Sequence, residues 1–124
     1  MPSHEQMVAA VNGYVAAFDK GDPAAVAALF APDATVEDPV GTDAHKGHDA
    51  ILAFYTMSMQ TGAKLKLEGP VRTATNYAAF AFSVSFGHSA DARVDVIDTF
   101  KFNDEGKVVE MRAYFGPNNM QGLG

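Results

Sequence analysis

Two aspartates and one tyrosine occupy positions where an apolar side chain is expected. Asp98 interrupts the apolar side of an alternating segment over 94–102, and Asp38 does the same over 34–40. Tyr14 falls in the apolar stripe of an N-terminal segment with helical spacing. A core position normally excludes Asp, because burying an unpaired charge costs more free energy than packing returns. These residues are therefore the candidates for chemistry.

Each of the three also has an ordinary structural explanation. An inward Asp can bond backbone N–H groups, or a bulge can expose it to solvent. An inward Tyr more often packs in a core, where its hydroxyl finds a partner. Perturbed groups cluster at functional sites without defining them. The three positions therefore indicate a site only if the fold brings them into one cavity.

The two carboxyl groups suit different tasks. Keeping an Asp neutral at pH 7 requires raising its pKa by about 3 units, and burial among apolar groups can supply about 3–5 units. Asp98 could then stay protonated and donate a hydrogen bond. Asp38 precedes Pro39, which favours a strand end or a loop near a pocket mouth, where the carboxylate stays ionised as a base. A base opposite two neutral donors, Tyr14 and Asp98, suits proton abstraction beside a carbonyl.

Three helices are expected to position these residues in the N-terminal half. Apolar residues recur three and four positions apart in each of them, and Ser3 with Gln6 forms a capping box at the first. Pro23 and Pro32 mark the start and the end of the second. Their expected extents are Ser3 to Gly21, Asp22 to Pro32 with Phe30 facing inward, and His48 to Met59.

After Gly62 the period changes from helical to two, which is typical of half-buried strands. The strands are expected within 64–68, 78–86, 94–102 and 107–115, with a hairpin connection at 103–106. Helices followed by strands predict an α+β fold, in which helices cover one face of a mostly antiparallel sheet. We expect one domain over 1–124, with a flexible tail at 116–124 because little there can pack.

Composition excludes several classes of function. Nine Lys and Arg against fifteen Asp and Glu give a net charge of -6, and there is no cysteine. Thiol catalysis and cysteine-based metal sites are excluded, and nucleic-acid or membrane partners are disfavoured. With no run of about 20 apolar residues and no basic residue before Lys20, we expect a cytoplasmic protein. Asp43, His45 and His48 are interpreted as a solvated loop, so no metal is expected.

Several motifs resemble those of the steroid Δ5-3-ketoisomerases (ketosteroid isomerases) of the nuclear-transport-factor-two-like superfamily. The resemblance extends from about Met7 to Gly116, and its most specific part is ATVEDPVG at 34–41. YVAA at 14–17, VAALF at 26–30, AAFAF at 78–82 and Ile97-Asp98 also match. The resemblance implies a cone-shaped fold with three N-terminal helices packed on a curved, mostly antiparallel mixed sheet. It also implies a homodimer and a cis Asp38–Pro39 bond.

By this resemblance, Asp38 is the general base that moves a proton from C4 to C6 of a 3-oxo-Δ5 steroid, without a cofactor. Tyr14 and a protonated Asp98 form the oxyanion hole, an arrangement for which this family is well known. Tyr55 supports the Tyr14 hydroxyl by hydrogen bonding. The pocket for the apolar steroid substrate would be lined by Phe30, Phe54, Val84, Phe86, Phe100, Met111 and Phe115.

Two other functions stay open at this point. One is a different reaction on the same fold, such as that of a polyketide cyclase or an epoxide hydrolase. An epoxide hydrolase of this kind needs an inward Arg, whereas Arg93 and Arg112 fall opposite the apolar faces of their strands. The other is a non-catalytic module that binds an apolar ligand in the same pocket.

Overall fold

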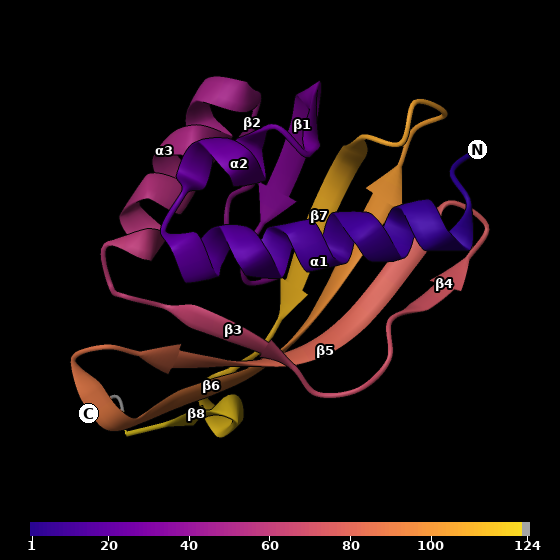
Figure 1. Cartoon of the computed structure of the whole chain (residues 1–124). Helices are drawn as coiled ribbons and strands as arrows, with labels where there is room; N and C mark the ends of the chain where they lie inside the picture. Colours follow the sequence, from indigo (N-terminus) through magenta and orange to yellow (C-terminus); the bar gives the residue numbers. More distant parts are fainter. Residues whose placement is uncertain (123–124) are drawn as a thin grey trace.

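Helix α1 spans His4–Lys20 in the computed structural model, which describes residues 1–122 of the chain. Ser3 and Gln6 form the predicted capping box, and Gly21 ends the helix with φ 66°, a conformation that glycine adopts without steric cost. The helix lies across the sheet, as Figure 1 shows. Its buried residues are Met7, Val11, Tyr14, Ala17 and Phe18. Tyr14 is therefore directed from the middle of α1 towards the sheet.

The second helix is shorter than predicted. α2 covers only Pro23–Ala27, and the chain enters strand β1 (Phe30–Glu37) before Pro32. The carbonyl of Leu29 accepts a hydrogen bond from Val108 N–H, and proline disfavours helical geometry in the residue before it. Strand pairing therefore replaces helix at this point, and the expectation of a helical Phe30 was wrong. The third helix, α3, spans His48–Met59 as predicted.

The described residues form an eight-stranded sheet in the order β2-β1-β7-β6-β5-β3, with β4 paired to β5 and β8 paired to β6. The parallel pair is β1 with β7, and the remaining pairs are antiparallel. This confirms the mostly antiparallel mixed sheet. The other strands are β2 (His45–Lys46), β3 (Lys64–Leu67), β4 (Arg72–Ala74), β5 (Tyr77–Phe86), β6 (Ser89–Phe102), β7 (Val108–Tyr114) and β8 (Met120–Gln121).

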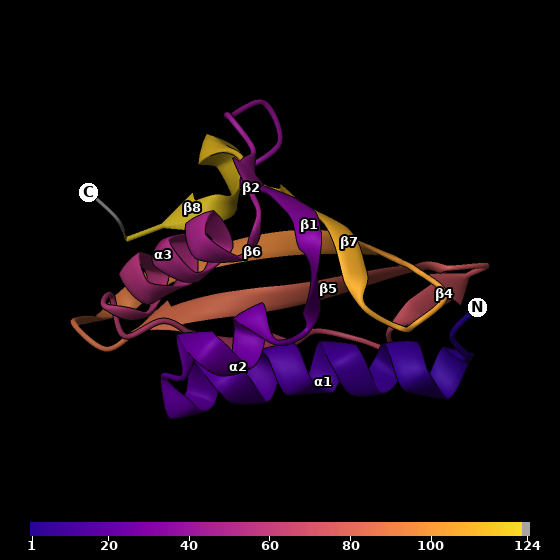
Figure 2. The same ribbon diagram turned by 90° about the horizontal axis from the view of Figure 1, so that it is seen from above.

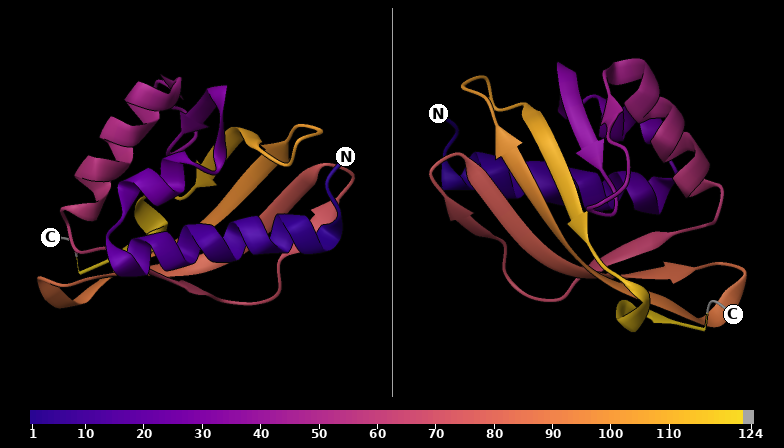
Figure 3. Two further views of the ribbon diagram at one scale, coloured as in Figure 1. Left: turned by 45° about the horizontal axis from the view of Figure 1, so that its top comes forward. Right: turned by 180° about the vertical axis from the view of Figure 1, so that it is seen from behind.

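The helices gather on one side of a curved sheet, which confirms the α+β fold. Viewed from above, α1 and α2 lie along one face of the long strands β5 and β6 (Figure 2). α3 packs against α2, β1 and β2. Seen from behind, the opposite face of these long strands carries no α-helix in the described part of the chain (Figure 3). The core therefore forms between the helices and the inner face of the sheet.

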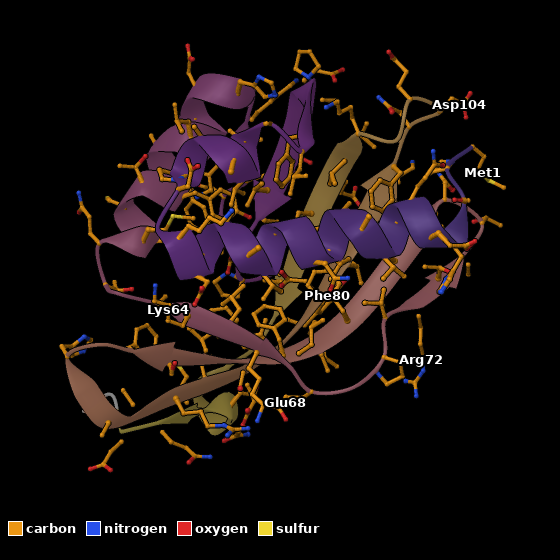
Figure 4. All side chains as sticks on the ribbon, viewed as in Figure 1. Met1, Lys64, Glu68, Arg72, Phe80 and Asp104 are labelled. Carbon is orange, nitrogen blue, oxygen red and sulfur yellow. The ribbon has the colours of Figure 1, made fainter. Side chains whose placement is uncertain are left out.

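Aromatic side chains fill the space between α1 and the sheet. Phe80 points from β5 towards α1 (Figure 4), and its ring centroid lies 6.2 Å from that of Tyr14 and 5.0 Å from that of Phe100. The Tyr14 and Phe100 centroids are 5.3 Å apart with nearly perpendicular rings. Edge-to-face pairs of this kind add to the gain from burial. The Tyr14 ring is thus held in a packed cluster.

Part of the C-terminal segment, which the sequence predicted to be a flexible tail, has regular structure and pairs with the sheet. Pro117–Asn119 forms a short 3-10 helix, η1, and β8 pairs with β6 through Arg93↔Gln121 and Val94↔Met120. The remainder of the predicted flexible tail, residues 123–124, lies outside the described residues. Among the described residues, no helix is long and apolar enough to cross a membrane.

Candidate active site

The residues singled out from the sequence line one cavity of about 300 Å³. Tyr14 reaches it from α1, Tyr55 from α3 and Asp98 from β6, while Asp38 enters from the loop that follows β1. Tyr14 and Asp98, the pair that lies furthest apart in the sequence, are separated by 84 positions. The condition set by the sequence, that the polar residues meet in one cavity, is satisfied.

Asp98 is an inward-facing and isolated carboxyl. Its side of β6 is buried at every second position, its exposed fraction is 1%, and it pairs with Phe80 on β5 and Ala113 on β7. Neither of its oxygens has a hydrogen-bond partner among the described residues. Both ordinary explanations therefore fail, because the residue is neither exposed at a bulge nor bonded to backbone N–H groups. A buried orphan group of this kind is suited to a bound ligand.

Electrostatics favour the protonated form of Asp98. Burial raises its pKa well above the ordinary value of 3.8, and the charge of Asp38 raises it further, while the nearby Tyr14 hydroxyl opposes them. Desolvation disfavours the charged state of any carboxyl, and a second carboxylate close by has the same effect. A protonated Asp98 carries an O–H donor that faces the cavity.

Asp38 is the less buried carboxyl and lies just beyond the end of β1. The Asp38–Pro39 bond is cis, as the resemblance implied. Burial raises the pKa of Asp38 from 3.8 to about 6. Above that pH most of the protein carries the Asp38 carboxylate, so this group can accept a proton.

The two tyrosines form a hydrogen-bonded pair at the same cavity. Their hydroxyl oxygens are 3.0 Å apart. Burial raises the pKa of both phenols well above 10. If the Tyr55 hydroxyl donates to Tyr14, the Tyr14 proton is free for a ligand in the cavity. The site then offers two neutral donors, Tyr14 and Asp98.

The apolar lining agrees only in part with the sequence. Phe54, Val84, Phe86 and Phe115 line the cavity, whereas three other residues expected there do not. Phe30, Phe100 and Met111 are almost fully buried in the core, on strand positions that the helices and neighbouring strands cover completely. They act behind the site: the Phe100 ring packs on Tyr14 and the Phe30 ring on Tyr55.

Other lining residues were not singled out from the sequence. Phe82, Val94 and Val96 lie on the same alternating faces that were recognised as inward, so their pattern carried the signal. Ser58 and Thr61 had no such signal, because their place depends on how α3 and the following turn pack over the sheet. The additional lining residues are Phe18, Ser58, Thr61, Ala63, Leu65, Phe82, Val94 and Val96.

The guanidinium groups lie away from the cavity. Arg93 pairs with Asp95 at 2.9 Å, and Arg112 lies 3.6 Å from both Glu37 and Glu110. Both Arg side chains are nearly half exposed. No arginine is among the residues described as lining the cavity. The water-activating Asp–Arg–Asp set of an epoxide hydrolase is therefore not assembled around Asp38.

The histidines near the cavity have packing contacts. His45 belongs to β2, although the sequence predicted a loop there, and its ring packs at a tilt against that of Phe54, with the centroids 4.5 Å apart. His48 begins α3, and its Nε2–H donates to the Phe30 carbonyl at 2.7 Å. Within residues 1–122, no group of three or more acidic or histidine side chains is placed to hold a metal ion.

The chain is similar to known proteins in both sequence and fold. Residues 11–111 match the model of the SnoaL-like domain family. The steroid Delta-isomerase of Nocardioides simplex is 42% identical over 118 residues, which cover 93% of this chain and 94% of that protein. The solved structure of the epoxide hydrolase/cyclase-like enzyme SalBIII, described for pyran ring formation in the polyether salinomycin, has a TM-score of 0.89 and covers 98% of each chain. At 22% identity, this last likeness shows the fold alone.

Proposed function

Because the chain belongs to the SnoaL-like domain family and, within it, to the steroid Delta-isomerases, we propose that it converts 3-oxo-Δ5 steroids into 3-oxo-Δ4 steroids. The protein is an isomerase enzyme. The proposed reaction moves one proton from C4 to C6 and needs no cofactor. The observation that carries the proposal is that Asp98, buried without a hydrogen-bond partner among the described residues, shares one largely apolar cavity with Asp38.

Asp38 acts as the general base in both proton transfers. Its carboxylate takes a proton from C4, and the electron pair of the C–H bond forms the C3=C4 bond of a dienolate. The same carboxyl then returns the proton to C6, so that the double bond ends between C4 and C5. A pKa of about 6 suits this task, because the group is ionised at neutral pH yet basic enough to hold the proton between the two steps.

Tyr14 and Asp98 stabilise the negative charge that develops on the C3 oxygen. Both groups are neutral donors whose pKa burial has raised. Donors that are fixed before the reaction favour the charged dienolate over the ketone, because they need no reorganisation when charge develops. Tyr55 supports Tyr14 through the 3.0 Å contact of their hydroxyls.

The remaining walls suit a rigid apolar substrate. The side chains between Asp98 and the far end of the cavity are mainly aliphatic and aromatic, from β3, β5, β6 and α3. Such a surface gains free energy by excluding water from an apolar ring system. It also keeps water from the carboxyl groups, which preserves the difference between their pKa values.

The test is a spectrophotometric assay for the conjugated enone with a 3-oxo-Δ5 steroid. Asp38→Asn removes the base and should lower turnover by roughly 10²–10⁴-fold. Asp95→Asn is the matched control, because Asp95 lies on the same strand as Asp98 but pairs with Arg93 at the surface. Near-normal turnover by Asp38→Asn would defeat the assignment of the base.

The same assay separates the two other functions. A non-catalytic carrier would bind the steroid without producing the enone. A cyclase or epoxide hydrolase would leave the Δ5 ketone unchanged and act on a different substrate. The position of Arg93 and Arg112 outside the cavity favours the isomerase over an epoxide hydrolase.

We also propose that the protein is a homodimer that works in the cytoplasm. On the side of the sheet opposite the α-helices, Ile97, Tyr114 and the neighbouring Val40 are each between 43% and 50% exposed. Contiguous exposed apolar groups favour burial against a partner. Sedimentation analysis should give the mass of a dimer, and Ile97→Lys should shift it towards the monomer. A wild-type protein that sediments as a monomer at all concentrations would exclude this assembly.

A further inference from the structure

Glu37 precedes the base in the chain but its side chain lies on the other side of β1. Its Oε2 accepts a hydrogen bond from the Gly41 N–H at 2.8 Å. This contact closes the four-residue loop 38–41, which carries the Asp38 carboxyl into the cavity. Gly41 has φ 102°, a backbone conformation that other residues rarely adopt. The loop is thus closed from outside the cavity by the carboxylate of the preceding residue.

The loop is also joined to strand β7. Glu37 and Arg112 are register partners in the parallel pair of β1 with β7, and Arg112 Nε lies 3.6 Å from Glu37 Oε1. The Val40 N–H donates to the Ala113 carbonyl at 2.8 Å. The backbone on both sides of Asp38 is therefore fixed: Glu37 and Val40 are each tied to β7.

The Asp38 carboxyl needs this external support because it must stay free to react. It lies beyond the last residue of β1, and no hydrogen bond to another described residue orients its oxygens. A carboxylate that accepts strong hydrogen bonds from a neighbouring group is a weaker proton acceptor. Its direction must then come from the backbone of the loop that carries it.

We propose that Glu37, oriented by Arg112, is a positioning residue that sets the direction and the depth of the Asp38 carboxyl by closing the loop 38–41. The proposal rests on the proposed function of Asp38 as the base. Glu37 faces away from the cavity and is not among the residues that line it, so it acts only through the loop. Displacing a base by about 1 Å can cost about 10²-fold in rate, whereas an exposed ion pair contributes little to stability.

The pKa of Asp38 depends on its burial and on the titratable groups that surround it. Tyr14 of α1, Tyr55 of α3 and Asp98 of β6 line the same cavity as Asp38, and the ion pair of Glu37 with Arg112 of β7 lies outside the cavity beside the loop. Burial is the cause of the raised Asp38 pKa. If the loop opens, water reaches the carboxyl and the pKa should fall towards its ordinary value.

The test compares three variants of the whole protein. Glu37→Ala removes the acceptor for Gly41 N–H and should lower kcat by about 10- to 100-fold with KM changed by less than about twofold. Glu37→Gln keeps an amide oxygen that can accept the same hydrogen bond, and it should recover most of the lost kcat. Glu110→Ala is the matched control, because Glu110 also lies 3.6 Å from Arg112 but does not contact the loop.

A second measurement does not depend on activity. Carboxyl NMR titration should show a lower Asp38 pKa in Glu37→Ala than in the wild type, and little change in Glu37→Gln or Glu110→Ala. If the wild type produces no enone, the proposed function fails while this titration still tests the loop. The inference is overturned if Glu37→Ala keeps the wild-type kcat and Asp38 pKa, or if Glu110→Ala is impaired as strongly as Glu37→Ala.

Discussion

Replacing Asp38 with asparagine should stabilise the folded protein at neutral pH while it removes the proposed base. Burial raises the pKa of Asp38 from 3.8 to about 6 in the folded protein, whereas an unfolded chain has the ordinary value. The folded state therefore binds this proton more tightly. The resulting stability is fully present below the unfolded pKa and is lost as the pH rises through about 6. Asparagine has no proton to lose.

The magnitude follows from the difference between the two pKa values. A difference of about 2 pKa units corresponds to about 3 kcal/mol in the free energy of unfolding. Domains of this size are stable by about 5–15 kcal/mol, so the effect is a large fraction of the total. The ionised base at neutral pH is thus a source of instability that the proposed reaction requires.

The assay is urea unfolding followed by circular dichroism at pH 4 and pH 7.5, at one protein concentration because a dimer would make stability concentration-dependent. The gain of Asp38→Asn over the wild type should be larger at pH 7.5 than at pH 4 by about 2 kcal/mol, because an unfolded carboxyl is already partly ionised at pH 4. Asp95→Asn is the control and should show no such gain, because Asp95 lies at the surface beside Arg93. An equal gain for Asp38→Asn at both pH values would refute this reasoning.

Three other outcomes are expected. The acid limb of the kcat/KM profile should have an apparent pKa of about 6, because the base must be ionised, and a flat profile between pH 4 and 8 would argue against this. Tyr14→Phe should lower kcat by about 10²–10³-fold with a smaller change in KM, and steady-state kinetics that show only a KM effect would contradict the proposed role of Tyr14 as an oxyanion donor. Phe80→Ala should destabilise the fold by about 3–5 kcal/mol, since Phe80 is 2% exposed beneath the Tyr14 ring; an unchanged urea midpoint would contradict this packing.

Local patterns predicted the direction of the key side chains. The alternation along β6 placed Asp98 inward, and the helical spacing of α1 placed Tyr14 on the buried side, as the structure shows. Capping residues gave the bounds of α1, because a cap is a contact between residues three positions apart. These predictions succeeded because each depends on neighbours that are close in the chain.

Other expectations failed where distant segments compete. Phe30 was expected in a helix, but pairing with Val108 places it in β1. Phe100 and Met111 were expected to line the pocket on account of their inward direction. They are instead covered completely, because alternation gives the face of a strand and not what packs over each position on it.

The sequence by itself determined the α+β class and the inward direction of Asp98 and Tyr14. Its resemblance to a known family added Asp38 and Tyr55 to the same predicted site. Only the tertiary structure decided that these groups share one cavity, that Asp98 has no hydrogen-bond partner in the described chain, and that Glu37 closes the Asp38 loop against β7. The physical reason is that periodicity records contacts a few residues apart. Solvation and proton affinity depend on segments that meet only after the sheet has formed.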